Sequence, residues 1–196
     1  MTYASLATGI LLAAGRGSRF DPQGLQNKLL APLADGTPVA RAAARHLLTS
    51  VPRVVAVVRT GADLLAQVLE EAGCDVLFSV ESERGMGASL AAGVRASADS
   101  PGWIVALADM PWIAPETIET VARRLDEGAS IVVPRHEGRR GHPVGFGAAH
   151  AQTLAALGGD VGARALLASA QLTEIEVPDR GILADVDTPG DLRGET

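Results

Sequence analysis

A short glycine-rich segment near the start of the chain carries residue types that bind phosphate. Gly15–Arg19 (GRGSR) follows an apolar run and lies ahead of Lys28. Glycine has no Cβ and accepts positive φ, so backbone N–H groups in such a loop can approach a phosphate closely, while arginine and lysine supply positive charge. The segment is neither a Walker loop nor a complete dinucleotide fingerprint. A triphosphate loop of another kind is indicated, with a solvated surface turn as the alternative.

An aspartate in the middle of the chain is placed to hold a metal ion. Asp109 follows the apolar run Trp103–Ala108, which is typical of a buried strand. Mg²⁺ in proteins usually takes carboxylates together with phosphate oxygens. The alternative is that Asp109 caps the next helix, but Pro115 marks the expected start of that helix and leaves Ala114 as its cap. The metal role is therefore the favoured interpretation.

Further carboxylates stand in the tail. Asp185 and Asp187 flank Val186, and in an extended segment side chains two residues apart point to the same side. These paired carboxylates can therefore share a metal ion with Asp109 from across a crevice. The competing interpretation is a short terminal helix that is capped by Thr188 and has a proline at its first position. Both interpretations can hold together.

The histidines give weaker signals. His142, within Gly141–Pro143, could act as a general base, bind the acceptor, or only hydrogen-bond within a loop. His46 and His150 are expected at the surface, and His136 in a loop without an evident partner. No Ser/His/Asp or Cys/His motif is evident, which argues against hydrolysis through a covalent intermediate.

The composition favours one globular domain in a reducing compartment. The chain has 196 residues, 47% of them hydrophobic and only 3% aromatic, so the core must be built from Ala, Val, Leu and Ile. A net charge of −6 argues against non-specific nucleic-acid binding. No apolar stretch approaches the ~20 residues of a membrane span. The single cysteine, Cys74, is more typical of packing than of a nucleophile, and a cytoplasmic location is expected.

Short β-rich runs alternate with longer helical patterns along the chain. This alternation predicts an α/β fold with a doubly wound, mostly parallel sheet and helices on both faces, in one domain over residues 1–196. A polar turn at His136–Gly141 and a short apolar run at Pro143–Phe146 interrupt it. Strands are predicted at Gly9–Ala14, Arg53–Arg59, Asp75–Val80, Gly102–Ala108, Ser130–Pro134 and Leu172–Val177, and helices at Pro38–Leu48, Ala62–Ala72, Ala88–Ala98, Pro115–Leu125, Ala148–Leu157 and Val161–Ala170.

The segments that follow the predicted strands are the informative ones. In open α/β sheets, ligands bind beyond the carboxyl ends of the strands. Ala13–Arg19 follows the first strand, Gly85–Ser89 comes after the third, and Asp109–Pro111 follows the fourth. Glycine-rich loops and an acid would then meet at one rim of the sheet. The sequence therefore predicts a nucleotide site there.

Taken in order, these segments resemble the nucleotidyltransferases related to molybdopterin-dinucleotide synthases. Leu12–Arg19, followed by Asn27–Leu30, is similar to the signature loop of that group. The later blocks resemble those of molybdenum cofactor cytidylyltransferases, and the match runs nearly from end to end. These blocks are Gly85–Leu90, Leu107–Pro111, Gly138–Val144, Gly159–Arg164 and Asp185–Pro189.

The resemblance implies a Rossmann-like fold and transfer of CMP from CTP to a molybdopterin-type cofactor, with release of pyrophosphate and delivery to a client molybdoenzyme. It implies that Asp109 and Asp187 hold Mg²⁺ and that Lys28 and Arg19 act on the triphosphate. An alanine-glycine pair at 14 and 15 favours cytosine, because the guanylyl branch tends to have two glycines there. The implied nucleotide-binding residues are Ala13, Ala14, Gly15, Arg16, Gly17, Ser18, Gly85 and Ser89, and those on the pterin side are Gly141, His142 and Pro143.

One segment departs from the resembled pattern. Phe20 stands after Arg19 where the family usually has Met-Gly, and residues 21–26 lengthen the loop before Lys28. Within the class, the alternative is guanylyl or other nucleotidyl transfer to a different phosphorylated acceptor. Outside the class, the alternatives are a cofactor-binding chaperone for a molybdoenzyme and an NAD-type oxidoreductase. The missing third glycine disfavours the oxidoreductase.

Overall fold

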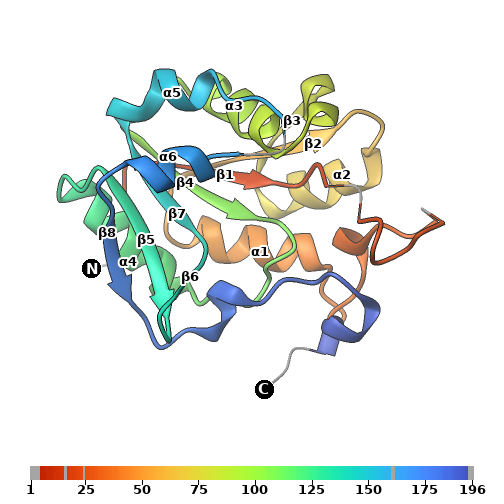
Figure 1. Cartoon of the computed structure of the whole chain (residues 1–196). Coiled ribbons are helices and arrows are strands. Elements are labelled where there is room, and N and C mark those ends of the chain that lie inside the picture. The colour runs from red at the N-terminus through yellow and green to blue at the C-terminus, as the bar shows by residue number, and fades with distance from the viewer. Residues whose placement is uncertain (1–4, 16, 24, 160–161, 194–196) are drawn as a thin grey trace.

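The protein folds around one mixed β-sheet, seen in the computed structural model of Figure 1, which describes residues 5–15, 17–23, 25–159 and 162–193. Within those residues the sheet has eight strands in the order β3-β2-β1-β4-β7-β5-β6, with β8 paired to β5. Neighbours from β3 to β4 are parallel, whereas β7 runs antiparallel to both β4 and β5. The predicted α/β class with a mostly parallel, Rossmann-like sheet is confirmed. The strands are β1 (Thr8–Leu12), β2 (Arg53–Arg59), β3 (Asp75–Ser79), β4 (Gly102–Leu107), β5 (Ile131–His136), β6 (Arg139–Arg140), β7 (Val144–Gly147) and β8 (Thr173–Glu176).

The helices follow the predicted pattern closely up to α4 and less closely after it. The expected helix at Ala148–Leu157 is instead a 3₁₀ turn, Ala148–His150, followed by a short α5. His150 at the junction has φ −91° and ψ 0°, and its ring bonds Ser130 Oγ at 2.8 Å. Val161, the expected start of the next helix, lies outside the described residues. The helices are α1 (Val39–Leu48), α2 (Asp63–Ala72), α3 (Met86–Ala96), α4 (Pro115–Asp126), α5 (Ala151–Ala155) and α6 (Arg164–Ser169), with further 3₁₀ turns at Lys28–Leu30, Val80–Arg84, Arg180–Leu183 and Pro189–Arg193. In the described part of the chain, no helix has the length and apolar character that crossing a membrane requires.

The sheet separates two hydrophobic cores, and α1 and α3 lie on its opposite faces (Figure 1). On β2, Val54, Ala56 and Val58 pack into the core shared with α1, α2 and α4. Val55 and Val57 pack into the core shared with α3 and α5. All five are buried, as predicted for a strand covered on both faces. With both faces filled by apolar side chains, polar chemistry is left to the ends of the strands.

The chain after β8 returns to the sheet and ends beside the N-terminal loop. In Figure 1 this blue segment passes below the sheet toward the orange-red region that contains Lys28. The His142 N–H donates to the Ile182 carbonyl at 3.1 Å, and the Val186 N–H donates to the Asp109 carbonyl at 2.8 Å. A Cβ on Gly141 would collide with the Ile182 carbonyl, so a glycine is needed for this close approach.

The start of α4 is capped from a distant part of the sequence. Ala114 occupies the cap position, as predicted, but has no side chain to accept a hydrogen bond. Asp179 supplies the acceptor instead, binding the Ala114 N–H at 2.9 Å and the Thr117 hydroxyl at 2.7 Å. Its other oxygen accepts from the Gly181 N–H at 2.8 Å. Asp179 thus fastens the returning tail to α4.

Replacing Asp179 should therefore destabilise the fold. Asp179→Ala leaves the N–H groups of Ala114 and Gly181 without their acceptor and should lower the free energy of unfolding by about 1–2 kcal/mol. Asp179→Asn keeps only one of the two acceptor oxygens and places an N–H₂ group against the other donor, so its stability should lie between that of Asp179→Ala and that of the wild type. Urea unfolding followed by circular dichroism measures both variants. Equal loss in the two variants would show that hydrogen-bond acceptance is not what Asp179 contributes.

Candidate active site

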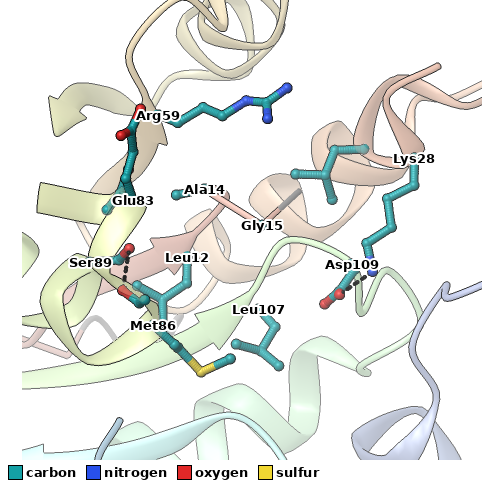
Figure 2. Close-up of a pocket in the computed structure, with 13 residues that line it drawn as sticks. Leu12, Ala14, Gly15, Lys28, Arg59, Glu83, Met86, Ser89, Leu107 and Asp109 are labelled. Atoms are coloured by element: carbon teal, nitrogen blue, oxygen red, sulfur yellow. Dashed lines mark hydrogen bonds and ion pairs between the residues drawn. The ribbon is translucent and has the colours of Figure 1, made fainter. Parts of the chain in front are cut away.

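A cavity of about 490 Å³ opens beyond the carboxyl ends of β1, β2 and β4, where the sequence predicts a nucleotide site (Figure 2). Its volume falls in the range typical of small-molecule sites. Apolar side chains form its lower part in Figure 2, and charged side chains stand at its upper and right edges. The cavity is lined by Leu12, Ala14, Gly15, Lys28, Leu29, Arg59, Ser82, Glu83, Gly85, Met86, Ser89, Leu107 and Asp109.

Small residues keep the floor of this cavity open. A Cβ added at Gly15 would meet nothing within 4 Å, so the missing side chain leaves empty space in front of the loop. Ser89, in the first turns of α3, donates its hydroxyl hydrogen to the Gly85 carbonyl at 3.3 Å. Ala14, Gly15, Gly85 and Ser89 were all predicted to bind the nucleotide, and the structure places all four at the cavity. Their role as nucleotide contacts stays a prediction.

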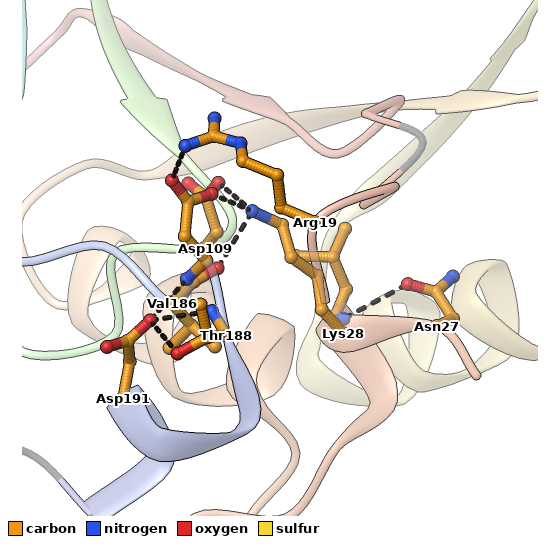
Figure 3. A network of polar contacts seen from close by, with 9 residues as sticks. Arg19, Asn27, Lys28, Asp109, Val186, Thr188 and Asp191 are labelled. Atoms are coloured by element: carbon orange, nitrogen blue, oxygen red, sulfur yellow. Dashed lines mark hydrogen bonds and ion pairs between the residues drawn. The ribbon is translucent and has the colours of Figure 1, made fainter. Parts of the chain in front are cut away.

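The ammonium group of Lys28 sits at the right edge of the cavity in Figure 2, and Figure 3 shows that it binds residues from two other segments. It donates to Asp109 Oδ2 at 2.7 Å, to the Val186 carbonyl at 2.8 Å and to Asp187 Oδ1 at 3.2 Å. Only 9% of the side chain is exposed. Burial alone would lower the pKa of Lys28, but its hydrogen bonds to and charge attraction by Asp109 and Asp187 outweigh burial and raise it. The ammonium is therefore charged.

Local structure fixes the backbone position of Lys28 and the direction of the first part of its side chain. Asn27 caps a 3₁₀ turn, and its side-chain oxygen accepts from the Leu29 N–H at 3.0 Å. Gly17, in the glycine loop, has φ +61°, and a Cβ there would lie 3.3 Å from Lys28 Cγ. A side chain at residue 17 would thus be both strained and crowded. The lysine stem accordingly runs directly against the glycine loop, despite the lengthened segment that separates them in the sequence.

Three carboxylates gather around the lysine. Asp109, Asp185 and Asp187 each offer an oxygen, and these oxygens lie within 4.8 Å of one another. Burial raises the pKa of Asp185, helped by the negative charges of Asp187 and Asp109. Closely spaced carboxylate oxygens are the hard donors that Mg²⁺ and Mn²⁺ prefer, so this donor set fits a divalent cation. The sequence pattern proposed that Asp185 and Asp187 share a metal ion with Asp109, whereas the resemblance implied only Asp109 and Asp187, and the structure brings all three carboxylates together.

Capping of the terminal turn is carried out by another acid. Asp191 accepts hydrogen bonds from the Asp187 N–H at 3.0 Å, the Thr188 N–H at 2.6 Å and the Thr188 hydroxyl at 2.9 Å. The hydrogen bonds from Thr188 hold the pKa of Asp191 below its usual value. The predicted terminal turn with Pro189 at its first position, directly after Thr188, is present, but the Thr188 hydroxyl donates to Asp191 instead of accepting a cap hydrogen bond. Asp187 is free of capping and points toward Lys28.

Most of the described residues of the glycine loop do not line the cavity. Arg19 forms an ion pair with Asp187, and its side chain is 77% exposed. Ser18 is exposed, and neither Gly17 nor Ser18 lines the cavity. Arg16, predicted to bind phosphate, lies outside the described residues. Ala13 does not reach the cavity either, because its side chain is buried in the core and its N–H donates to the Val57 carbonyl at 2.9 Å.

The residues predicted on the acceptor side are not among those that line this cavity. Gly141, His142 and Pro143 join β6 to β7 and do not line it. The Nδ1 atom of His142 is buried and has no hydrogen-bond partner among the residues the structure describes. Burial lowers the pKa of His142, although a backbone hydrogen bond with Val105 and the charge of Asp109 act in the opposite direction. The imidazole is thus neutral near pH 7.

Two expectations about other residues have clear outcomes. Cys74 is buried, and its pKa is raised to about 12, chiefly by burial, so it packs and is unsuited to act as a nucleophile. His136 was expected to lack a partner, which is wrong, because its Nδ1 bonds the Val177 carbonyl at 2.9 Å. His136 thereby ties β5 to the segment after β8.

Sequence reasoning missed several residues of the cavity. Arg59, Ser82 and Glu83 line it, and Arg59 is the last residue of the Val-rich run that was predicted as β2. The rule that ligands bind beyond the carboxyl ends of the strands also covers the end of the second strand, where Arg59 lies. The prediction considered only the segments after the first, third and fourth strands. In the described residues, the Arg59 side chain has no carboxylate partner, unlike Lys28 and Arg19.

The fold and this arrangement of loop, lysine and acids match a known class. Residues 9–175 match the model of the MobA-like NTP transferase domain family, and the chain belongs to that family. It is similar to the purine catabolism protein PucB of Bacillus subtilis, with 31% identity over 92% of this chain and 91% of that one. It is equally similar to the nicotine blue oxidoreductase of Paenarthrobacter nicotinovorans, with 31% identity over 92% of each chain.

Among further relatives, one is named for guanylyl transfer and another has a structure that contains manganese. A probable molybdenum cofactor guanylyltransferase of Natronomonas pharaonis is 32% identical over 66% of this chain and 62% of its own length. Rv0371c from Mycobacterium tuberculosis has a crystal structure that superposes with a TM-score of 0.80 at 30% identity, covering 96% of both chains. A structure of Rv0371c in complex with manganese superposes with a TM-score of 0.75.

The neutral state of His142 should make stability depend on pH. Because its pKa is lower in the folded protein, the unfolded chain takes up the proton first as the pH falls. The folded state is therefore fully stable with respect to this group above the ordinary histidine pKa of ~6.5. That stability is lost as the pH falls through this value toward the lower pKa of His142 in the folded protein. The urea midpoint of the wild type should therefore drop more than that of His142→Gln between about pH 7.5 and about pH 5.5. Parallel pH profiles would contradict the assignment.

Proposed function

We propose that this protein is a Mg²⁺-dependent cytidylyltransferase that transfers CMP from CTP to a molybdopterin-type phosphorylated acceptor and releases pyrophosphate. The observation that carries the proposal is the meeting of Lys28 with Asp109 and Asp187 at the edge of a cavity that Ala14 and Gly15 help to line. Positive charge for phosphates and carboxylates for a cation stand side by side there. Membership of the MobA-like NTP transferase family supports the same class of reaction.

The residues of this chain would act by alignment and charge. An oxygen of the acceptor phosphate attacks the α-phosphorus of the nucleotide, and the bond between that phosphorus and the oxygen leading to the β-phosphate breaks. An acceptor phosphate is already a nucleophile, so no strong general base is required. Asp109 and Asp187 would hold the cation, with Asp185 beside them. The cation, when bound, withdraws charge from the phosphate oxygens.

Lys28 and Arg19 would neutralise the triphosphate. The apolar lower part of the cavity in Figure 2 would receive the base. Positioning and fixed charges of this kind account for much of the rate enhancement in phosphoryl chemistry. The product would pass to a client molybdoenzyme, and the reaction would take place in the cytoplasm. The resemblance implies these partners, and the name of the molybdenum cofactor guanylyltransferase relative supports an acceptor of this type.

The choice of base rests on one methyl group. Ala14 lines the cavity beside Gly15, and a side chain at that position takes up space that a larger purine ring could use. Guanylyl transfer is the close alternative, because one relative is named a guanylyltransferase. Ala14→Gly should shift the preference from CTP toward GTP if this methyl group selects the base.

A second class of function has one observation in its favour, the relative named as an oxidoreductase. A hydride-transferring enzyme would need a nicotinamide or comparable cofactor and would have no use for a carboxylate cluster that fits a divalent cation. A chaperone that only escorts the cofactor would not need the cluster either. The described site therefore favours the transferase.

The first prediction for this function concerns Asp109. Asp109→Asn removes a carboxylate charge while keeping the shape of the side chain, and turnover should fall at least ~100-fold, as loss of a metal ligand usually causes. Pyrophosphate release is measured with Mg²⁺, the molybdopterin acceptor and each triphosphate in turn, and CTP should be preferred. Asp63→Asn, on the exposed start of α2, is the matched control and should keep wild-type activity.

Several outcomes separate the alternatives. Near wild-type turnover in Asp109→Asn would contradict the metal role. Preference for GTP would keep the class and change the base. Binding of nucleotide without pyrophosphate release would favour the chaperone, and substrate-dependent oxidation of NADH or NADPH would favour the oxidoreductase.

The second prediction concerns Arg59, the charged cavity residue without a carboxylate partner in the described structure. In Figure 2 its guanidinium extends on the side of Gly15 and away from Ser89, which suits contact with phosphate more than with the base. Arg59→Ala should weaken triphosphate binding about tenfold, as expected for a charge-assisted hydrogen bond, and leave binding of the nucleoside nearly unchanged. Arg53→Ala, at the opposite end of β2, is the control. Calorimetry measures both, and equal loss for nucleoside and triphosphate would place Arg59 at the base.

A further inference from the structure

The ammonium of Lys28 has no donor to spare. A lysine ammonium carries three N–H donors, and the structure gives it three acceptors, Asp109 Oδ2 at 2.7 Å, the Val186 carbonyl at 2.8 Å and Asp187 Oδ1 at 3.2 Å. In this state Lys28 has none left for a phosphate. The residue expected to bind the triphosphate is instead directed at the acids (Figure 3).

The same acids are the candidate ligands of the divalent cation. Asp109 and Asp187 belong to the cluster whose carboxylate oxygens lie within 4.8 Å of one another. An ammonium and a divalent cation would compete for these oxygens, because both need to be close to them and they repel each other. The arrangement in Figure 3 therefore differs from the one in which both metal and triphosphate are bound.

We propose that Lys28 is a placeholder cation: it holds Asp109 and Asp187 together in the ligand-free protein and turns to the triphosphate only when a divalent cation takes over these carboxylates. This inference rests on the nucleotidyltransferase function proposed above and adds a coupling between its two ligands. A triphosphate that arrives alone meets carboxylates and an occupied lysine. A triphosphate that arrives with metal meets neutralised carboxylates and a free lysine.

The position of the Lys28 stem means that the ammonium need move only a short way to leave the acids for the glycine loop. Lys28 Cγ lies beside Gly17 of the glycine loop, so the stem already borders the segment predicted to hold phosphates. The ammonium stands on a flexible chain of four carbons, and rotation within that chain can redirect it without moving the backbone. The Lys28 side chain also lines the cavity. The exchange therefore needs only a change of rotamer.

A double-mutant cycle without metal tests the proposal. CTP binding is measured in EDTA for the wild type, Asp109→Asn, Lys28→Met and the double variant. Removing the Asp109 charge weakens the shortest of the three hydrogen bonds that hold Lys28 and frees one donor for phosphate. Asp109→Asn should therefore bind metal-free CTP about tenfold more tightly than the wild type, the worth of one charge-assisted hydrogen bond. In the Lys28→Met background the same substitution should give a much smaller gain. Circular dichroism checks that each variant is folded.

Asp185→Asn is the matched control, because it removes an acid of the same cluster that has no recorded hydrogen bond to Lys28. If the gain came only from weaker repulsion of the triphosphate, Asp185→Asn would match Asp109→Asn and the gain would persist without Lys28. Either result would overturn the placeholder role. Failure of every variant to bind CTP, with or without Mg²⁺, would instead count against the proposed function.

Metal binding alone gives an independent measure. Mn²⁺ binding, followed by electron paramagnetic resonance without nucleotide, should be about tenfold or more tighter in Lys28→Met than in the wild type, because the competing ammonium is gone. Arg19→Met removes the exposed cation that pairs with Asp187 and should change Mn²⁺ affinity far less. Equal affinity of Lys28→Met and wild type would contradict competition between lysine and metal.

Discussion

One charged group holds together the segments that meet at the edge of the sheet beside the cavity. The Lys28 ammonium joins three stretches that are far apart in the sequence: the N-terminal loop, the end of β4 and the tail after β8. Without Lys28 the carboxylates of Asp109 and Asp187 would repel each other, and without them the buried ammonium would have no partner of opposite charge. Two carboxylates held close together need a cation between them, and a buried ammonium needs carboxylates. The three segments therefore stabilise one another only when all are in place.

The rest of the fold serves to deliver these charges to one point. Apolar residues fill both faces of β2, so the sheet core is rigid and leaves polar groups at strand ends. Gly141 lets the tail pass against the β6–β7 connection, and Asp179 fastens the tail to α4. Asp191 then fixes the turn that presents Asp187. None of these contacts requires the nucleotide, so the site is largely prepared before a ligand arrives.

The sequence carried the local information well and the long-range information poorly. The run RVVAVVR predicted β2 with its observed limits, because continuous valines are typical of strands buried on both faces. Asp109 was recognised because a carboxylate at a buried strand end is conspicuous. Asp179 could not be recognised, since its partners are 62 and 65 residues away and follow only from the packing of the tail. The resemblance pointed to Lys28 and Asp187, but that Lys28 binds Asp187 follows only from the coordinates.

The order of the chain has a consequence for synthesis on the ribosome. Every strand of the described sheet is complete by Glu176, whereas Asp185 and Asp187 come later. Domains generally fold as units, and the buried core includes Ile182 and Val186 of the same tail. A nascent chain therefore lacks part of its core for as long as it lacks two of the three acids of the cluster. Completion of the core and completion of the acidic cluster depend on the same late segment.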